Sequence, residues 1–145
     1  MLKKFKIPFE IKVSSAHRSP ERTAQIARSA EQRGIKVLIA CAGGAAHLAG
    51  AIAANTTLPV IGIPIESSPL RGIDSLLSTV QMPAGIPVAT MAIGQSGSVN
   101  ASLFALEILA LQNPSLSARL KEYRKELALK AERKSQAVEE EFSSP

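Results

Sequence analysis

Both histidines of this 145-residue chain lie in short runs that mix reactive, basic and glycine residues. His17 precedes Arg18, and His47 ends the run Gly43-Gly44-Ala45-Ala46-His47. An imidazole exchanges protons near neutral pH, and a guanidinium forms a two-pronged contact with phosphate or carboxylate. The pairing of His17 with Arg18 therefore favours proton transfer beside a bound anion. The ordinary alternatives are a loop histidine bonded to backbone and an arginine in a surface ion pair.

The Gly43-Gly44 turn allows a ligand to approach the backbone closely, with N–H groups at a following helix start directed at an anion. The signal is weak, because many such turns are only tight turns, and the run is neither a dinucleotide-binding nor a P-loop pattern. His47 is expected in the first turn of that helix. There it could donate to a carboxylate, although a packed helical histidine is the commoner interpretation.

The residues that other kinds of catalysis require are not found in this sequence. No Cys/His cluster has zinc spacing, and no nucleophile-elbow pattern is present. The carboxylates near the candidate loops are Glu66 and Asp74, and Asp74 is expected to cap a helix rather than to catalyse. Metal-dependent chemistry is therefore not expected.

Composition excludes several classes of partner. The net charge is +5, but the basic residues between Arg119 and Lys134 alternate with glutamates, which is typical of a solvated helix face. Aromatic residues make up only 3% of the chain, so stacking partners for nucleic acid are scarce. No run approaches the roughly 20 apolar residues of a membrane span. The single Cys41 suits a reducing compartment, so we expect a soluble cytoplasmic protein that binds neither nucleic acid nor membrane.

The elements that position these loops follow from hydrophobic periodicity and capping residues. We expect strands over residues 9–13, 35–40, 59–63 and 87–93, and helices over 20–33, 45–54, 74–80, 98–111 and from 114 onward, with N-caps at Ser19, Asp74, Ser98 and Asn113. Alternating strands and helices predict one α/β domain over residues 1–134 with a parallel sheet covered by helices, followed by a frayed tail over 135–145. Ligands bind at the carboxyl ends of strands in such sheets, where both histidine runs fall.

Taken together, the motifs resemble the N5-carboxyaminoimidazole ribonucleotide mutase family, over Met1 to about Arg124. The matching runs are Ser15-Ala16-His17-Arg18-Ser19-Pro20, Ala42–Leu48, Asp74-Ser75-Leu76, Val80-Gln81-Met82-Pro83, Gly85-Ile86-Pro87-Val88 and Asn100-Ala101. Several long motifs in the right order make the resemblance specific. Small residues, Cys41 and Ala49, stand where the family commonly has Gly and Pro.

The resemblance implies an enzyme of purine synthesis that moves a carboxyl group from the exocyclic nitrogen of aminoimidazole ribonucleotide to ring carbon 4. It implies no metal, no organic cofactor and a homo-octamer. His17 would be the general acid/base, with Ser15 and Arg18 near the phosphate and ribose. Substrate contacts around the migrating carboxyl would come from Gly43, Gly44, Ala45, Ala46 and His47, and Ala16 and Leu48 complete the substrate-binding set.

The resemblance also predicts a flavodoxin-like sheet of strand order 2-1-3-4-5 in which the first strand and a G-S-x-S-D loop are missing. Residues 1–8 match only the end of the family's first helix. The absent strand would stand between 9–13 and 35–40, so weak turnover is expected of this chain. Two alternatives remain open: a carboxylase that uses free carbon dioxide, and an inactive structural subunit.

Overall fold

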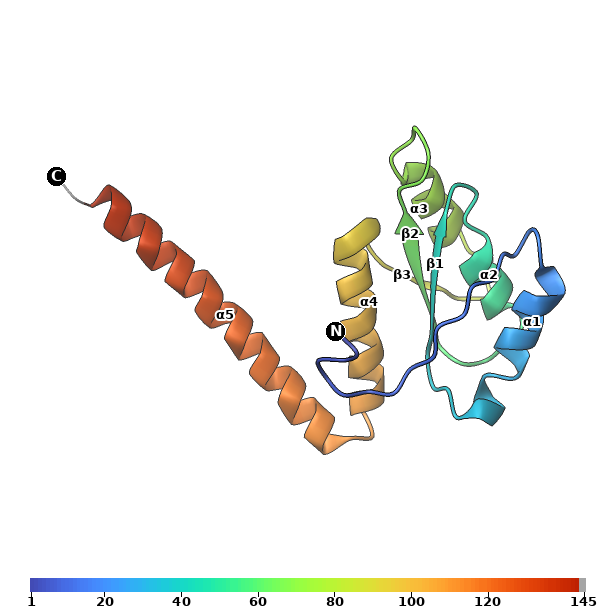
Figure 1. Cartoon of the computed structure of the whole chain (residues 1–145), viewed down its shortest axis with the longest axis horizontal. Helices are drawn as coiled ribbons and strands as arrows, with labels where there is room; N and C mark the ends of the chain where they lie inside the picture. The colour runs from blue at the N-terminus through green and yellow to red at the C-terminus, as the bar shows by residue number, and fades with distance from the viewer. Residues whose placement is uncertain (144–145) are drawn as a thin grey trace. The chain divides into compact units, whose positions relative to one another are not determined.

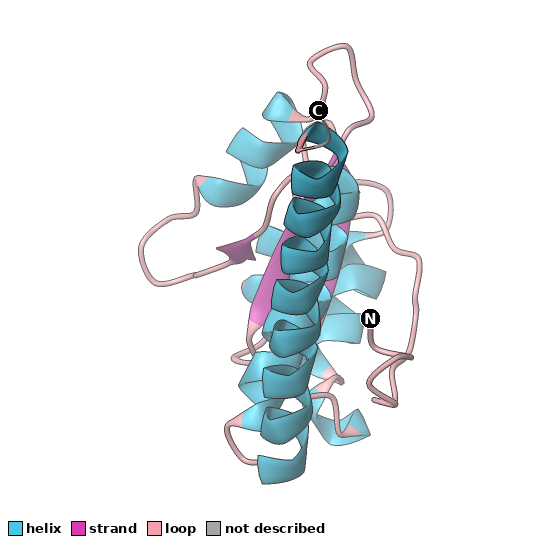
Figure 2. Ribbon diagram, turned by 90° about the vertical axis from the view of Figure 1, so that its left-hand side faces the viewer, coloured by secondary structure: helices cyan, strands magenta, loops and turns pink. Residues whose placement is uncertain are grey.

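The computed structural model describes residues 1–143, and the chain falls into two compact units, one from Met1 to Ala105 and one from Leu106 onward (Figure 1). Helices account for most of its regular structure (Figure 2). In chain order the elements are α1 (Pro20–Arg28), the 3-10 helix η1 (Glu31–Arg33), β1 (Leu38–Gly43), α2 (Leu48–Ala53), β2 (Val60–Ile65), α3 (Ile73–Val80), β3 (Ala89–Thr90), α4 (Gly94–Ala110) and α5 (Pro114–Phe142).

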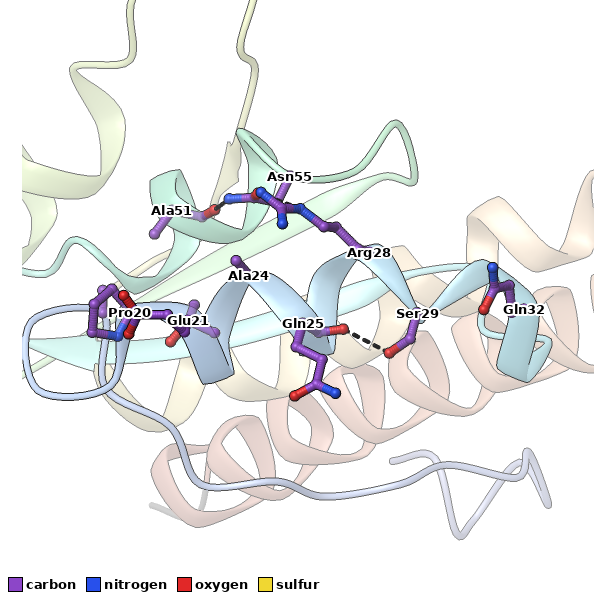
Figure 3. A pocket seen from close by; sticks show the side chains of 11 residues that line it. Pro20, Glu21, Ala24, Gln25, Arg28, Ser29, Gln32, Ala51 and Asn55 are labelled. Carbon is purple, nitrogen blue, oxygen red and sulfur yellow. Dashed lines mark hydrogen bonds between the residues drawn. The ribbon is translucent and has the colours of Figure 1, made fainter.

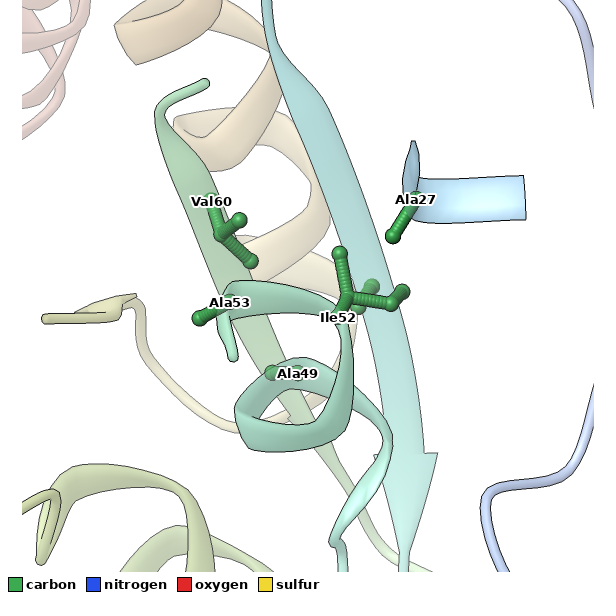
Figure 4. Close-up of a cluster of buried hydrophobic side chains, with 6 residues drawn as sticks. Ala27, Ala49, Ile52, Ala53 and Val60 are labelled. Atoms are coloured by element: carbon green, nitrogen blue, oxygen red, sulfur yellow. The ribbon is translucent and has the colours of Figure 1, made fainter. Parts of the chain in front are cut away.

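The strands of the first unit form one parallel sheet in the order β1-β2-β3. Leu38 of β1 pairs with Val60 of β2, and the register continues to Gly43 and Ile65. Strand β2 is buried along nearly its whole length, as expected for the middle of a parallel sheet covered on both faces. Helices α1 and α2 lie on one side of β1 and β2, and the part of α4 in this unit lies on the other (Figures 1 and 4). The predicted flavodoxin-like α/β fold is confirmed.

The predicted strand over residues 9–13 is wrong, because this segment forms no ladder. Ile11 and Val13 are 82% and 85% exposed, and an ion pair of 2.8 Å between Glu10 and Arg33 ties the segment down. The alternation of side chains was real, but a strand also needs a neighbour for its backbone groups. In the expected order this segment and β1 are not adjacent, and β1 pairs only with β2 among the described strands.

Several predicted boundaries also move. The helix expected over 20–33 divides into α1 and η1, and Gly34, at φ 80°, ends it as predicted. The strand expected over 87–93 shrinks to Ala89–Thr90. Ser98 is not a cap, because α4 begins at Gly94 and the Ser98 hydroxyl donates to the Gly94 carbonyl.

The second unit holds the end of α4 and all of α5. Asn113 caps α5 as predicted, because its side-chain oxygen accepts from the Leu116 N–H at 3.0 Å. Leu106, Leu116 and Leu120 are buried. Helix α5 continues through residues 135–142, where a frayed tail was expected, and residues 144–145 of that tail lie outside the described range. The domain boundaries at 134 and 135 remain a prediction.

Small side chains let the helices of the first unit approach its sheet closely. The core cluster consists of Ala27, Ala40, Ala49, Ile52, Ala53 and Val60 (Figure 4). Ala27 belongs to α1 and Ala49 and Ala53 to α2, so alanines form much of the contact between the two helices and the strands. Burying the larger Ile52 side chain contributes roughly 1.5–3 kcal/mol. This packing fixes where α1 and α2 begin, and those beginnings carry the two histidine runs.

Gly62 of β2 lies at the tightest point of this packing. A Cβ atom at Gly62 would lie 3.0 Å from Val88 Cγ1 and 3.3 Å from Ala49 Cβ, and closer still to Thr79 Cγ2. Ala49 belongs to α2, Thr79 to α3 and Val88 to the segment just before β3, so these neighbours cannot all move. Gly50 of α2 differs, because a Cβ there would meet only the flexible end of Met82, with the Sδ atom at 3.2 Å.

We therefore predict that Gly62→Ala lowers the free energy of unfolding by about 1–3 kcal/mol, the usual cost of overpacking a core. Gly50→Ala is the matched control. It should be neutral or slightly stabilising, because alanine is the better helix former. Urea unfolding followed by circular dichroism measures both changes, and equal midpoints for the two variants would contradict the packing argument.

Candidate active site

A serine-rich turn between residues 15 and 19 holds the first histidine run. The Ser19 N–H donates to the Ser15 carbonyl at 2.9 Å, and the Arg18 N–H donates to the Ser15 hydroxyl at 3.2 Å. Ser19 occupies the N-cap of α1 as predicted, but its hydroxyl donates to the Ser15 carbonyl instead of capping the helix. The turn is thus closed on itself, and it leaves the side chains of His17 and Arg18 exposed.

The second run follows β1 and leads into α2. Gly44 has a φ of 57°, and no atom would lie within 4 Å of a Cβ added there, so the turn is open on that side. Ala46 is buried and Ala45 is exposed. His47 is the N-cap residue of α2, and its carbonyl accepts the Ala51 N–H at 2.9 Å. His47 therefore lies one position before the first helical residue, whereas the sequence predicts it inside the first turn of the helix.

The two histidines meet. His17 Nε2 lies 2.6 Å from His47 Nδ1, a hydrogen bond in which one ring must donate and the other accept. The ring centroids are 4.7 Å apart and the planes cross at 82°. This contact joins residues 30 positions apart in the chain. Nδ1 of His17 and Nε2 of His47 take no part in this contact. Either nitrogen can therefore bind a third group while the two rings share a proton.

A third loop, after β2, packs against the glycine turn. A Cβ atom on Gly43 would lie 2.7 Å from Ser67 Cβ and 3.1 Å from the Ile65 carbonyl oxygen. Only glycine fits at this position. Sequence reasoning did not include Ser67 among the site residues. The contact depends on the parallel pairing of β1 and β2, which no local pattern shows.

The same loop holds a carboxylate close to the helix start of α3. The Ser68 hydroxyl donates to Asp74 Oδ2 at 2.7 Å, and this bond holds the pKa of the Asp74 carboxyl below its ordinary value. Asp74 is not the N-cap of α3, as had been predicted, because Gly72 takes that position with a φ of 87°. Asp74 lies in the first turn and fixes the loop through Ser68.

The structure brings some of the predicted site residues into direct contact, whereas no hydrogen bond within residues 1–143 links the others to the two imidazole rings. His17 and His47 touch, and Ser15 shapes the turn that carries His17. Within residues 1–143 the Arg18 guanidinium makes no ion pair or hydrogen bond, so it is available to an anion. Leu48 opens α2 and packs against the core cluster.

A separate hollow of about 580 Å³ lies between α1 and α2 (Figure 3). Its lining residues are Ala16, Pro20, Glu21, Thr23, Ala24, Gln25, Arg28, Ser29, Gln32, Ala51 and Asn55. Ala16 is the only predicted site residue among them, and the side chain of Arg28 closes one part by donating to Asn55 Oδ1 at 3.0 Å. The histidine contact, with its free guanidinium and open glycine turn, has the better chemistry for a site.

Among the described residues, no three His, Cys, Asp or Glu side chains converge as ligands for a metal ion. No helix within residues 1–143 has the length and apolarity needed to cross a membrane.

The fold and these loops define a parallel α/β protein with a histidine pair at the carboxyl end of its sheet. Its sequence identifies the family, because the profile of AIR carboxylase matches residues 1–130. The chain belongs to this family.

Known relatives agree with the assignment. The N5-carboxyaminoimidazole ribonucleotide mutase of Pyrococcus horikoshii is 54% identical over 140 residues, covering 97% of this chain and 78% of the relative. The enzyme of that name from Pseudomonas aeruginosa is 57% identical over 124 residues, covering 86% and 76%. The crystal structure of PurE from Treponema denticola matches with a TM-score of 0.84 at 27% identity, covering 94% of this chain and 84% of that one.

The bond between Ser68 and Asp74 predicts a pH-dependent loss of stability in Ser68→Ala. The folded-state pKa of Asp74 is depressed, so the bond's contribution is present above the unfolded-state pKa and is lost as pH falls through the folded-state pKa. Ser68→Ala should lower Tm near neutral pH, and the difference from the parent should shrink as pH falls through the folded-state pKa of Asp74, leaving only the pH-independent loss of the bond from the Leu70 N–H.

The matched control is Ser78→Ala, which removes a 2.8 Å bond to the Asp74 backbone carbonyl. Because a carbonyl does not titrate, the Tm difference of this variant should not depend on pH. Scanning calorimetry from neutral pH down to about pH 2 compares the two, and a pH-independent difference for Ser68→Ala would contradict the role of the carboxylate.

Proposed function

We propose that this chain is an N5-carboxyaminoimidazole ribonucleotide mutase, which forms 4-carboxy-5-aminoimidazole ribonucleotide in de novo purine synthesis. The observation that carries the proposal is the 2.6 Å contact between His17 and His47. It unites the two loops whose sequences resemble the family's motifs, on a chain that is more than half identical to named mutases. Family membership alone gives the class of enzyme, and the contact supplies a proton-transfer group where the loops converge.

The chemistry suits these groups. The reaction breaks the bond between the exocyclic nitrogen and the carboxyl carbon, and it forms a bond between that carbon and ring carbon 4. The nitrogen gains a proton and carbon 4 loses one, so atoms balance with no added reagent. We assign His17 as the general acid/base for this exchange, at a magnitude typical of positioned proton transfer. His47 would hold the His17 ring in orientation and pass a proton through the shared hydrogen bond.

The remaining site residues are assigned by their positions. Arg18, with Ser15 and Ala16 in its turn, would bind the phosphate and ribose end, because the guanidinium lies exposed beside His17. The run Gly43, Gly44, Ala45, Ala46, His47 and Leu48 would surround the migrating carboxyl. The openness at Gly44 supports this, since a ligand can approach the backbone there without meeting a side chain.

Assembly and location are part of the same proposal. We assign a cytoplasmic homo-oligomer, with the octamer that the family resemblance implies, acting on a ribonucleotide without metal or cofactor. Helix α3 supports self-association, because the apolar residues Ile73, Leu77 and Val80 on it are all at least half exposed. Their spacing places them on one face, which is more apolar surface than an isolated helix of this size usually presents to water.

The first test of the function is His17→Asn. The variant keeps a polar side chain of similar size but cannot transfer a proton, so turnover should fall by about 10²–10⁴ while substrate binding changes little. The assay supplies the carbamate substrate in one arm and aminoimidazole ribonucleotide with bicarbonate in the other. A rate in the second arm that exceeds the first would assign the chain to the free carbon dioxide reaction, and a near-parental rate for His17→Asn would end its assignment.

The second test is Arg18→Lys. Lysine keeps the charge but lacks the planar fork that contacts two phosphate oxygens, so KM should rise about tenfold or more with a smaller change in kcat. Arg22→Lys is the matched control, because Arg22 is a neighbouring exposed arginine whose Nε donates to the Val13 carbonyl. Steady-state kinetics separate the two, and an equal KM for Arg18→Lys and the parent would contradict phosphate binding by Arg18.

A further inference from the structure

The buried face of α1 carries a polar residue. Helix α1 buries Thr23 and Ala27, four positions apart on one side of the helix. Ala27 belongs to the core cluster, and Thr23 is 1% exposed. A valine would fill the same space without a polar group, and a buried hydroxyl costs stability unless its hydrogen bonds are made. The hydrogen bonds of the Thr23 hydroxyl therefore indicate what this residue does.

These bonds join the two ends of the turn that carries the first histidine run. The Thr23 hydroxyl donates to the Ser19 carbonyl at 3.1 Å, and it lies 2.7 Å from the Ser14 hydroxyl. Because a hydroxyl has one proton to donate, and that of Thr23 goes to Ser19, Ser14 is the donor in the second bond. Donation thus runs from Ser14 to Thr23 and on to the Ser19 carbonyl, and in such a chain each bond polarises the next.

The bonds inside the turn give it a shape but do not attach it to the rest of the protein. The Ser15 N–H donates to Ser19 Oγ at 3.2 Å, and Ser19 Oγ donates to the Ser15 carbonyl at 3.1 Å. Both bonds begin and end within residues 15–19. Thr23, in contrast, belongs to a helix that is packed in the core through Ala27. Its two bonds therefore fasten the preformed turn to α1 on both sides of His17.

The position of the His17 ring depends on this attachment because the ring is exposed. His17 Nε2 and His47 Nδ1 are 2.6 Å apart, but both residues are exposed, so surrounding side chains do little to hold either ring. The place of His17 is then set by the backbone of its turn. A displacement of about 1 Å in a positioned group can lower the rate of an enzyme about a hundredfold.

We propose that Ser14 and Thr23 form a positioning pair, here called the turn clamp, that holds His17 against His47 for proton transfer. Neither hydroxyl needs to touch the substrate, because the pair acts through the backbone of the turn. The expected effect on turnover rests on the proposed function. The expected effect on the histidine contact does not, since that contact exists whichever reaction the protein catalyses.

Thr23→Val and Thr23→Ser separate the hydroxyl from the packing. Thr23→Val keeps the shape but removes both bonds, so kcat should fall about ten- to a hundredfold as His17 loses its position. KM should change less, because the long Arg18 side chain can still reach its anion. Thr23→Ser keeps the hydroxyl and should retain most of the parental kcat. Steady-state kinetics measure all three proteins, and a loss of rate that serine does not prevent would overturn the clamp.

Thr79→Val is the matched control for the loss of a buried hydroxyl. Thr79 is 3% exposed, and its hydroxyl donates to the Ser75 carbonyl at 2.6 Å, four positions earlier in α3, as that of Thr23 does in α1. Both valine variants delete a buried hydrogen bond and should lower Tm. Only Thr23→Val should lower kcat, and an equal kcat for the two valine variants would overturn the proposal.

Ser14→Ala tests whether the two hydroxyls act as a pair. It removes the donor to Thr23 and leaves the bond from Thr23 to Ser19, so it should lower kcat less than Thr23→Val does. In the double variant, Ser14→Ala should add nothing to Thr23→Val, because Ser14 has already lost its acceptor. A double variant whose loss in kcat is the product of the two single losses would contradict the pair.

Nitrogen NMR of the imidazole rings gives a measurement that needs no substrate. His47→Ala supplies the His17 signals of a ring without its partner. Thr23→Val should move the His17 signals of the parent toward those of His47→Ala, whereas Thr79→Val should leave them in place. Unmoved His17 signals in Thr23→Val overturn the clamp. If the signals move as expected but the parent has no mutase activity, the proposed function fails and the clamp stands.

Discussion

The parallel pairing of β1 with β2 is the interaction on which the candidate site depends. Their last paired residues are Gly43 and Ile65, so the two loops that follow start side by side. At strand spacing of about 4.8 Å, the space above Gly43 is just enough for Ser67 if residue 43 has no side chain. A larger residue at 43 would separate the loops and shift the start of α2. The position of His47, four residues beyond the end of β1, thus depends on the strand pair and not only on its own neighbours.

The second dependence is the alanine-rich contact of α1 and α2 with the sheet. Ala27, Ala49 and Ala53 are almost completely buried, which allows the helix axes to approach closely. Because His17 precedes α1 and His47 is the N-cap of α2, the distance between the helix starts determines whether the two rings can meet. A larger side chain in the contact between the helices and the sheet would therefore change the distance between the two histidine rings, although it does not touch them. Packing and chemistry are therefore coupled through two helix starts.

Sequence predicted the parallel sheet and the placement of the His47 run after the carboxyl end of a strand, because these follow from periodicity and chain order. It did not predict the contact of His17 with His47 or of Gly43 with Ser67, since each joins residues far apart in the chain. The strand predicted over residues 9–13 failed for a related reason. Side-chain alternation is a local property, whereas a ladder requires a partner. The caps assigned to Ser98 and Asp74 failed because α4 already begins at Gly94 and because Gly72 takes the N-cap position of α3.

The exposure of the histidine pair constrains how the proposed reaction can proceed. If carbon dioxide forms between the two steps, it must be recaptured before it diffuses away, which requires a site with little water. One chain leaves His17 and His47 exposed and the turn at Gly44 open, so it does not provide that enclosure alone. In the proposed assignment the ribonucleotide itself would cover part of the site, with its phosphate end at Arg18. Further cover would come from neighbouring copies that bury α3, because α3 directly follows the loop in which Ser67 packs on Gly43. Removing water there would also strengthen the contact between Arg18 and its anion. The proposed self-association and the proposed reaction would then share one requirement, since the exposed apolar face of α3 adjoins the loops from which water must be excluded.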